Sequence, residues 1–148
     1  MDIYNSDDYK IIKAIKKANN ELLRQDNILL KDYNLTASQF GVLESLYLKG
    51  NMCINKLIER LVSSSGTMTV IIKKLQEKGL IIKENSCEDK RYFNVCLTDE
   101  GRNLIMSILP DREKEIKDFA NTLTAEEKEK FLNIMYKFKE RYKVKKSE

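Results

Sequence analysis

Apolar side chains recur along much of the chain at the spacing of helices that bury one face. The first stripe follows Ser6, a candidate helix cap, and its narrow width predicts a helix of about six or seven turns that packs against a partner helix. The last stripe follows the sequence T-A-E-E at residues 124–127, which is typical of a capped helix start. The first stripe consists of Ile11, Ile15, Ala18, Leu22 and Leu29, and the last of Phe131, Ile134, Met135, Phe138 and Tyr142.

Three shorter helices are predicted after the first one. The sequence T-A-S-Q at residues 36–39 is a capping box for one of them, which ends at Gly50. The other two lie on either side of the polar break S-S-S-G at residues 63–66. Two short helices separated by a tight break are the outline of a helix-turn-helix. Their apolar positions are Ile54, Leu57, Ile58 and Leu61 in one helix and Met68, Ile71, Ile72 and Leu75 in the other.

The pattern changes to that of β-strands after the fourth helix. Residues 80–82 and 91–97 are rich in β-branched and aromatic side chains, and the polar segment 83–90 between them predicts a hairpin tip. Helix resumes at Thr98, and Pro110 either kinks this helix or restarts it. The predicted fold is mainly α with a small β-hairpin wing, in the order α-α-α-α-β-β-α-α.

Net charge says little about a partner. The 148 residues include 27 Lys and Arg against 23 Asp and Glu, which gives a formal charge of +4. The whole excess lies in residues 137–148, and the rest of the chain is neutral. A basic balance would favour nucleic acid, but a charged terminal segment is more often a solvated end.

Absent residue types exclude several kinds of chemistry. The sequence contains no histidine, so Ser–His or Cys–His catalysis and His-ligated zinc are excluded. Its five glycines are isolated from one another, so a Gly-rich phosphate loop is absent as well. We therefore expect neither an enzyme nor a bound cofactor or metal.

The cysteines and the apolar runs bear on the compartment. Three cysteines without a C-x-x-C spacing suit a reducing cytoplasm better than a disulfide framework. The N-terminal residues lack the pattern of a signal peptide, and the apolar runs are shorter than the roughly 18 residues of a membrane span. We expect a cytoplasmic protein that does not enter a membrane.

Six short motifs between Leu35 and Ile108 resemble the MarR (multiple antibiotic resistance regulator) family in order and spacing. They are L-T-A-S-Q-F-G-V-L, I-N-K-L-I-E-R-L, S-S-G-T-M-T, L-Q-E-K-G-L-I, D-K-R and L-T-D-E-G-R. The resemblance implies one domain over 1–148, with a winged helix-turn-helix at 35–109 and dimerisation helices at 1–34 and 110–148. It further implies a homodimeric repressor of a pseudo-palindromic operator in double-stranded DNA. Family members commonly release DNA when a small phenolic or lipophilic effector binds or a cysteine is oxidised.

The fourth predicted helix carries the candidate residues for reading DNA. Its apolar stripe faces the core, so its hydroxyls are free to bond phosphates or base edges, and Val70 can pack on a thymine methyl. Many relatives carry arginine at the position of Val70. This departure favours contacts through hydroxyls, methyl groups and groove shape, and hence an A·T-rich operator. The candidates are Ser64, which is also the expected N-cap of this helix, Ser65, Thr67, Thr69, Val70, Lys73 and Lys74.

The hairpin tip carries the second set of candidate DNA contacts, Lys83, Asp89, Lys90 and Arg91. The resemblance implies that Asp89 orients basic side chains and that Arg91 enters the minor groove, where an A·T-rich sequence attracts arginine. An alternative is a solvated surface pair with little energetic value. The alternative function is a winged-helix protein-interaction module without DNA binding. It is suggested by Val70, which stands where many relatives carry arginine, and by the balanced charge of the hairpin tip.

Two of the cysteines are candidates for a redox response. Cys53 is expected at the N-terminus of the third helix, where a thiol's pKa can fall, and Cys87 lies in the hairpin tip. Cys96 is expected to act as a small apolar side chain of the second strand. The family's peroxide sensors use a cysteine in the first helix, and this chain has none there.

Overall fold

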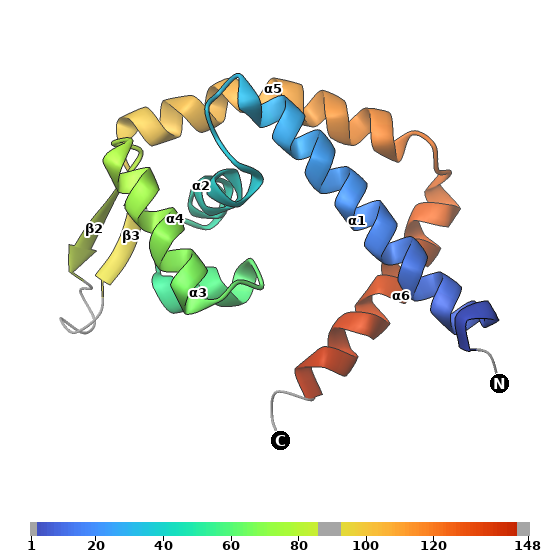
Figure 1. Ribbon diagram of the computed structural model, residues 1–148. Coiled ribbons are helices and arrows are strands. Elements are labelled where there is room, and N and C mark those ends of the chain that lie inside the picture. The colour runs from blue at the N-terminus through green and yellow to red at the C-terminus, as the bar shows by residue number, and fades with distance from the viewer. Residues whose placement is uncertain (1–2, 86–92, 145–148) are drawn as a thin grey trace. The chain divides into compact units, whose positions relative to one another are not determined.

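The computed structural model describes residues 3–85 and 93–144. The chain divides into two compact units, Met1–Leu109 and Pro110–Glu148, and Figure 1 shows their helices and strands. The elements are the 3-10 turn Ile3–Asn5, α1 (Asp7–Lys31), α2 (Ala37–Lys49), β1 (Met52–Cys53), α3 (Ile54–Arg60), α4 (Ser65–Glu77), β2 (Ile81–Asn85), β3 (Phe93–Leu97), α5 (Asp99–Ala120) and α6 (Ala125–Val144). The mainly helical fold class is thus confirmed.

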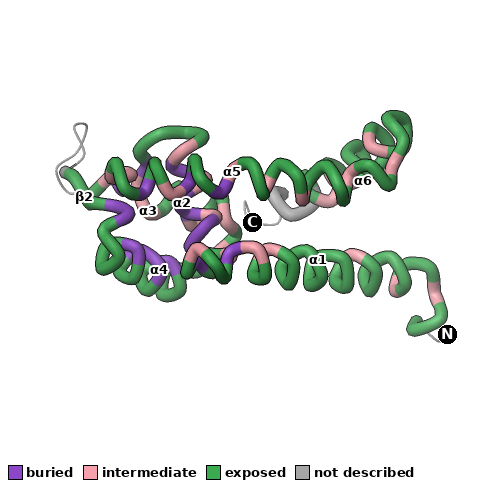
Figure 2. Tube along the Cα trace, turned by 90° about the horizontal axis from the view of Figure 1, so that it is seen from above, coloured by how far each residue is buried: buried purple, intermediate pink, exposed green. Residues whose placement is uncertain are grey.

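Helix α1 begins where the sequence predicts. The Ser6 side chain accepts a hydrogen bond from the Tyr9 amide, and two aspartates occupy the first turn, where they suit the positive end of the helix dipole. Among the 25 residues of α1 only Leu30 is buried. Much of the apolar stripe therefore stays at the surface within this chain, with Ile11 48% and Leu22 41% exposed, whereas Leu29 packs against the core. Figure 2 shows α1 as almost entirely exposed.

Helix α2 is the centre of the core in the first unit. Its predicted capping box is present: Gln39 donates its amide N–H to Thr36 Oγ1 at 3.2 Å, and Thr36 donates its own to Gln39 Oε1 at 3.1 Å. The buried face of α2 packs with the buried stripe of α4 and with Leu57 of α3. Gly50 ends the helix at a φ of 77°, a left-handed conformation that favours glycine.

The sheet contains one more strand than the sequence predicts. Residues Met52 and Cys53 form β1, which pairs with β3, so that the strand order is β1-β3-β2. Two residues are too few to show the alternation by which a strand is predicted. Val95 of β3 is buried in the core, whereas Phe93 near the hairpin tip is half exposed.

The start of α5 packs tightly against the beginning of β2. Thr98 Oγ1 accepts a hydrogen bond from the Gly101 amide at 3.0 Å and donates one to the Gly79 carbonyl at 2.7 Å. A Cβ atom on Gly101 would overlap the carbonyl oxygen of Leu80 and lie 3.0 Å from its carbon. The motif T-D-E-G thus supplies the helix cap, Thr98, and a residue without a Cβ atom, Gly101, at the point of closest approach.

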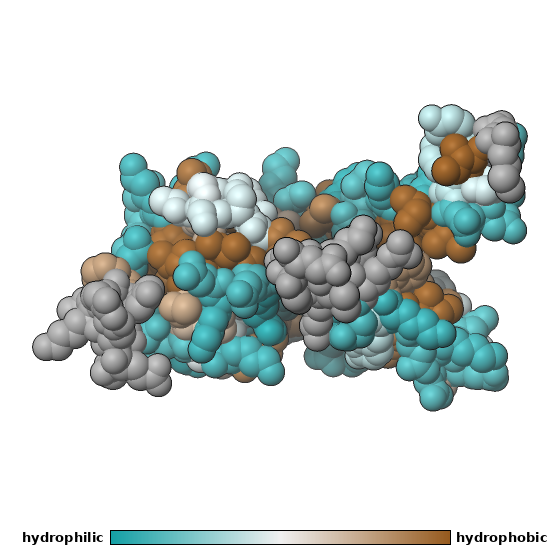
Figure 3. Space-filling view, turned by 90° about the horizontal axis from the view of Figure 1, so that it is seen from below, coloured by the Kyte–Doolittle hydropathy of each residue, from teal (hydrophilic) through white to brown (hydrophobic). Residues whose placement is uncertain are grey.

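The second unit consists of the later part of α5 and all of α6. Helix α5 continues through Pro110 instead of restarting there. The predicted cap of α6 is present, since Thr124 donates its amide N–H to Glu127 Oε2 at 2.8 Å. This backbone hydrogen bond lowers the pKa of Glu127. Up to residue 140, α6 has no buried side chain. Apolar surface remains visible on the face of the molecule drawn in Figure 3.

In the described parts of the chain, no helix is long and apolar enough to cross a membrane.

The turn between α3 and α4 contains a strained residue. Val62 has a φ of 50° and is 90% exposed. A left-handed conformation costs an L-residue about 1–2 kcal/mol, and a β-branched residue rarely adopts it. We expect Val62→Gly to raise the free energy of unfolding by about 1 kcal/mol, measured by urea denaturation. The control Val70→Gly, at an exposed valine inside α4, should lower it by about 0.5 kcal/mol. An equal loss in both variants would contradict strain at Val62.

Candidate nucleic-acid interface

Helix α4 is fixed to the core by one face and leaves the other free. Its buried residues are Met68, Ile71, Ile72 and Leu75, which confirms the predicted apolar stripe. Ser64 caps the helix as predicted, because its side chain accepts a hydrogen bond from the Thr67 amide at 3.2 Å. The same hydroxyl donates to Thr67 Oγ1 at 2.9 Å.

The α4 candidates occupy the part of the helix surface that the buried stripe leaves exposed, which we call the α4 face. Thr69 donates its hydroxyl to the Ser65 carbonyl at 2.8 Å, so its oxygen keeps lone pairs for accepting a further bond. Lys73 Nζ lies 3.9 Å from Glu77 Oε1. Because both side chains are exposed, this ion pair restrains the Lys73 side chain only weakly. The α4 face consists of Ser64, Ser65, Thr67, Thr69, Val70, Lys73 and Lys74, all of them exposed.

A contact that sequence reasoning missed joins the end of α3 to α2. Arg60 at the end of α3 donates its Nε–H to the hydroxyl of the buried Ser45 in α2, at 3.2 Å. Leu57, about one turn earlier on the same side of α3, is fully buried and anchors the helix in the core. The signal in the sequence was a serine inside an otherwise apolar helix face. Such a residue usually has a partner when buried.

Of the four wing candidates, the structure places one. Lys83 is exposed on β2, where it pairs in register with Val95 of β3. Asp89, Lys90 and Arg91 lie outside the described residues, as does Cys87. Their roles remain predictions.

The two described cysteines differ in environment. Cys96 is buried, and its Sγ donates to Glu84 Oε2 at 3.4 Å. Burial, with the nearby Glu84 carboxylate, raises the pKa of the Cys96 thiol to about 11, so the thiol stays protonated near neutral pH. This fits the predicted role of a small apolar side chain. Cys53 is partly exposed and occupies the cap position of α3, without a side-chain hydrogen bond to the helix.

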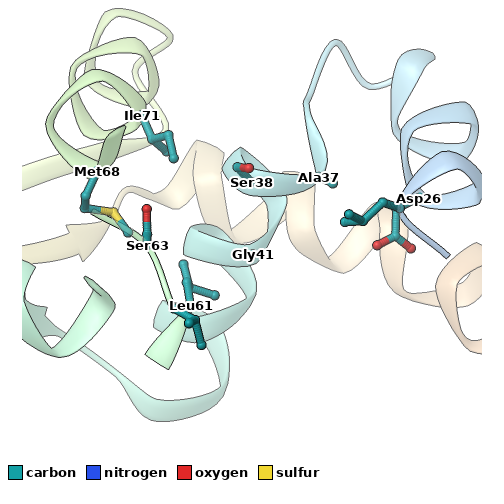
Figure 4. A pocket seen from close by; sticks show the side chains of 10 residues that line it. Asp26, Ala37, Ser38, Gly41, Leu61, Ser63, Met68 and Ile71 are labelled. Carbon is teal, nitrogen blue, oxygen red and sulfur yellow. The ribbon is translucent and has the colours of Figure 1, made fainter. Parts of the chain in front are cut away.

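A pocket of about 330 Å³ lies directly behind α4 in the first unit. Leu23 and Asp26 of α1 form one wall, and Met68 and Ile71 of α4 form another. Figure 4 shows the remaining walls, which come from α2 and from the turn before α4. We call this the α1–α4 pocket. A molecule bound in it would touch both the first helix and the helix that carries the candidate DNA contacts.

Comparisons with known proteins find relatives over most of the chain. A family model described as transcriptional regulator SarA/Rot matches residues 24–108. The HTH-type transcriptional regulator SarZ of Staphylococcus epidermidis is 30% identical over 118 residues, which cover 80% of this chain and 78% of SarZ. The HTH-type transcriptional regulator MhqR of Bacillus subtilis is 29% identical over 120 residues, covering 81% of this chain and 83% of MhqR.

Solved structures show the same fold. The DNA complex of MepR from Staphylococcus aureus matches with a TM-score of 0.83 at 19% identity, over 93% of this chain and 99% of MepR. A mutant MarR of Escherichia coli complexed with operator DNA matches with a TM-score of 0.82 at 24% identity, over 93% and 99% of the two chains. Together with the matched family model, they confirm the resemblance seen in the sequence motifs. The chain belongs to the MarR/SarA family of winged-helix proteins and is a DNA-binding transcriptional regulator, not an enzyme.

Proposed function

We propose that the protein is a homodimeric repressor that binds a pseudo-palindromic, A·T-rich operator with its α4 face. The exposure of all seven candidate side chains opposite a buried apolar stripe carries this proposal. A rigid helix that presents hydroxyls, a methyl-bearing side chain and two lysines to solvent matches the chemistry of a major groove.

The exposed stripes of α1 and α6 support a dimer. Ile11 and Leu22 on α1, and Phe131 and Ile134 on α6, are 41–53% exposed in the single chain. Burying such surface across a two-fold axis is favourable by about 25 cal/mol per Å². Two protomers related in this way would place their α4 helices about 10 base pairs apart.

The preference for A·T-rich DNA follows from what the α4 face lacks. Helix α4 contains no arginine, the residue that most often reads guanine, and the half-exposed Val70 suits a thymine methyl. On the wing we assign Lys83 and Lys90 to phosphates, Arg91 to the minor groove, and Asp89 to orienting the basic side chains.

Salt dependence tests whether DNA is held through its phosphates. The logarithm of the binding constant should fall with the logarithm of the salt concentration, at a slope of about 0.9 per phosphate contact. Family membership does not support the alternative of an interaction module without DNA binding. Such a module would show no salt-dependent affinity for mixed A·T-rich duplexes.

The α1–α4 pocket is the site we assign to an effector, a small phenolic or lipophilic molecule that releases DNA. Among the structural neighbours, one regulator was solved with bound 2,4-dichlorophenol, and the DNA binding of another is regulated by 6-hydroxynicotinic acid. A ligand between Asp26 of α1 and Met68 of α4 would shift α4 relative to the groove. The alternative trigger is thiol modification at Cys53 or Cys87, and diamide should then weaken DNA binding only while these cysteines are present.

The charge of Asp26 predicts which effectors bind. We expect 2,4-dichlorophenol, at a pH where it is neutral, to weaken DNA binding at least about tenfold, or 1.4 kcal/mol. The carboxylate of 6-hydroxynicotinic acid would be repelled by the Asp26 carboxylate on the pocket wall. Fluorescence anisotropy with labelled DNA measures both effects. In the Asp26→Asn variant, the two compounds should differ less in how strongly they weaken DNA binding. A stronger response to the acid in both proteins would contradict the assignment.

A further inference from the structure

A second pocket, of about 370 Å³, lies where the end of α1, the start of α2 and the last turns of α4 meet. Three lysines line it: Lys31 from α1, and Lys74 and Lys78 from the C-terminal end of α4. The rest of its wall is formed by Leu35 and by polar side chains of asparagine, threonine and glutamine, and no carboxylate contributes among the described residues. We call it the lysine pocket.

The charges of the lysine pocket are not balanced inside the protein. In the described parts of the chain, neither Lys31 nor Lys74 has a carboxylate within ion-pair distance, whereas Lys10, Lys117 and Lys130 each pair with an acidic residue on the same helix. Lys78 Nζ donates to the main-chain oxygen of Asn34, a neutral acceptor. Ammonium groups that share a pocket without a counter-charge favour an anion from outside.

The start of α2 adds a positive electrostatic potential to the pocket, while most of its first backbone amides already donate to acceptors within the protein. Helix α2, 13 residues long, starts at this pocket and directs the positive end of its dipole there. Asn34 is held at a φ of 54°, and its carbonyl keeps Lys78 at the rim. Lys78 is therefore positioned before any ligand arrives, while Lys31 and Lys74 are free to turn toward one.

We propose that the lysine pocket binds a phosphate group, and that on the operator this group belongs to the DNA backbone beside the groove that α4 reads. Lys74 belongs to both the α4 face and the pocket, so the two surfaces are continuous. The contact with DNA thus extends beyond α4 and the wing to Lys31, at the end of the first helix. The backbone assignment rests on the proposed operator binding, whereas a free phosphate would satisfy the same chemistry without it.

The test with DNA compares salt slopes for the wild type, Lys31→Gln, the double variant Lys31→Gln/Lys78→Gln and the control Lys13→Gln. Lys13 is an exposed lysine on the same helix, far from the pocket. We expect the double variant to lose affinity about tenfold, equally on operator and unrelated duplex, and its slope to fall by about 0.9. Lys31→Gln should show a smaller loss of affinity and a smaller change of slope, and Lys13→Gln should have the affinity and slope of the wild type. Among the described residues the Lys31 side chain makes no hydrogen bond or ion pair, so its variant remains informative if Lys78→Gln disturbs the turn at Asn34.

The test without DNA titrates the protein with inorganic phosphate at constant ionic strength and follows the backbone amide signals of residues 36–39 by NMR. Saturable shifts that the double variant lacks would support the pocket. If the DNA slopes of wild type and double variant were then equal, the phosphate would come from a free anion instead of the DNA backbone. If the double variant changed the salt slope of DNA binding but the wild type did not bind free inorganic phosphate, the pocket would bind only phosphates of the DNA backbone. No change in either test would overturn the proposal. If the wild type failed to bind DNA, the proposed function would fail, and the phosphate titration would still decide about the pocket.

Discussion

Replacing Gly101 by alanine is expected to lower the free energy of unfolding by about 3 kcal/mol. The added methyl group would overlap the backbone carbonyl of Leu80, and its next neighbour would be the side chain of Leu97 at 3.2 Å. A backbone group cannot turn aside as a flexible side chain can, so α5 would have to move away from the start of β2. The base of the wing and the first turn of α5 would loosen together.

Gly66→Ala is the matched control for this change. Gly66 also lies in the first turn of a helix, α4, but a Cβ atom there would meet nothing within 4 Å. Alanine restricts the unfolded chain and favours helix, so this variant should gain about 0.5–1 kcal/mol. Urea denaturation without DNA measures both. Equal effects of the two substitutions would show that the close approach of α5 to Leu80 does not constrain position 101.

Replacing Thr69 by glutamate is expected to weaken DNA binding at least about a hundredfold, or 2.8 kcal/mol, with little change in stability. Thr69 is exposed near the middle of the α4 face, and its hydroxyl donates to the carbonyl of Ser65 within the same helix. A carboxylate at this position would face DNA phosphates and the acceptor-rich edges of bases.

Thr122→Glu provides the same chemical change elsewhere. Thr122 is exposed, and its hydroxyl donates to the carbonyl of Phe119 at 2.8 Å, as that of Thr69 does to Ser65. It lies after the end of α5, in the second unit, whereas every candidate DNA contact belongs to the first unit, so its variant should bind DNA like the wild type. Titration of labelled duplex by fluorescence anisotropy compares the two. An equal loss in both variants would point to net charge, and not to the α4 face, as the cause.

Much of the helical framework could be predicted because its signals are local. Caps at Ser6, Thr36 and Ser64 and the helix end at Gly50 depend on residues within one turn, and all four were confirmed. Strand β1 could not be predicted from the sequence, because its pairing with β3 depends on residues that are distant in sequence. The continuous helix through Pro110 could not be decided from the sequence, since proline is compatible with a kink as well as a restart.

The exposed residues of the candidate site were easier to predict than the contacts and pockets between the helices that hold it. The α4 face follows from the helical period, which assigns each residue of α4 to the core or to solvent. The bond from Arg60 to Ser45 and both pockets depend instead on how separate helices pack. Lys31 and Lys78 gave no signal in the sequence, because a lysine near the end of a helix is common and usually solvated.

Selection of binding sites from random duplex DNA tests most directly whether a symmetric dimer reads DNA with the α4 face. We expect enrichment of an A·T-rich inverted repeat whose half-site centres lie about 10 base pairs apart, one helical turn of DNA. Protein carrying Thr69→Glu should not enrich it. G·C-rich half-sites, a single site without two-fold symmetry, or the same enrichment by the Thr69→Glu protein would contradict this account.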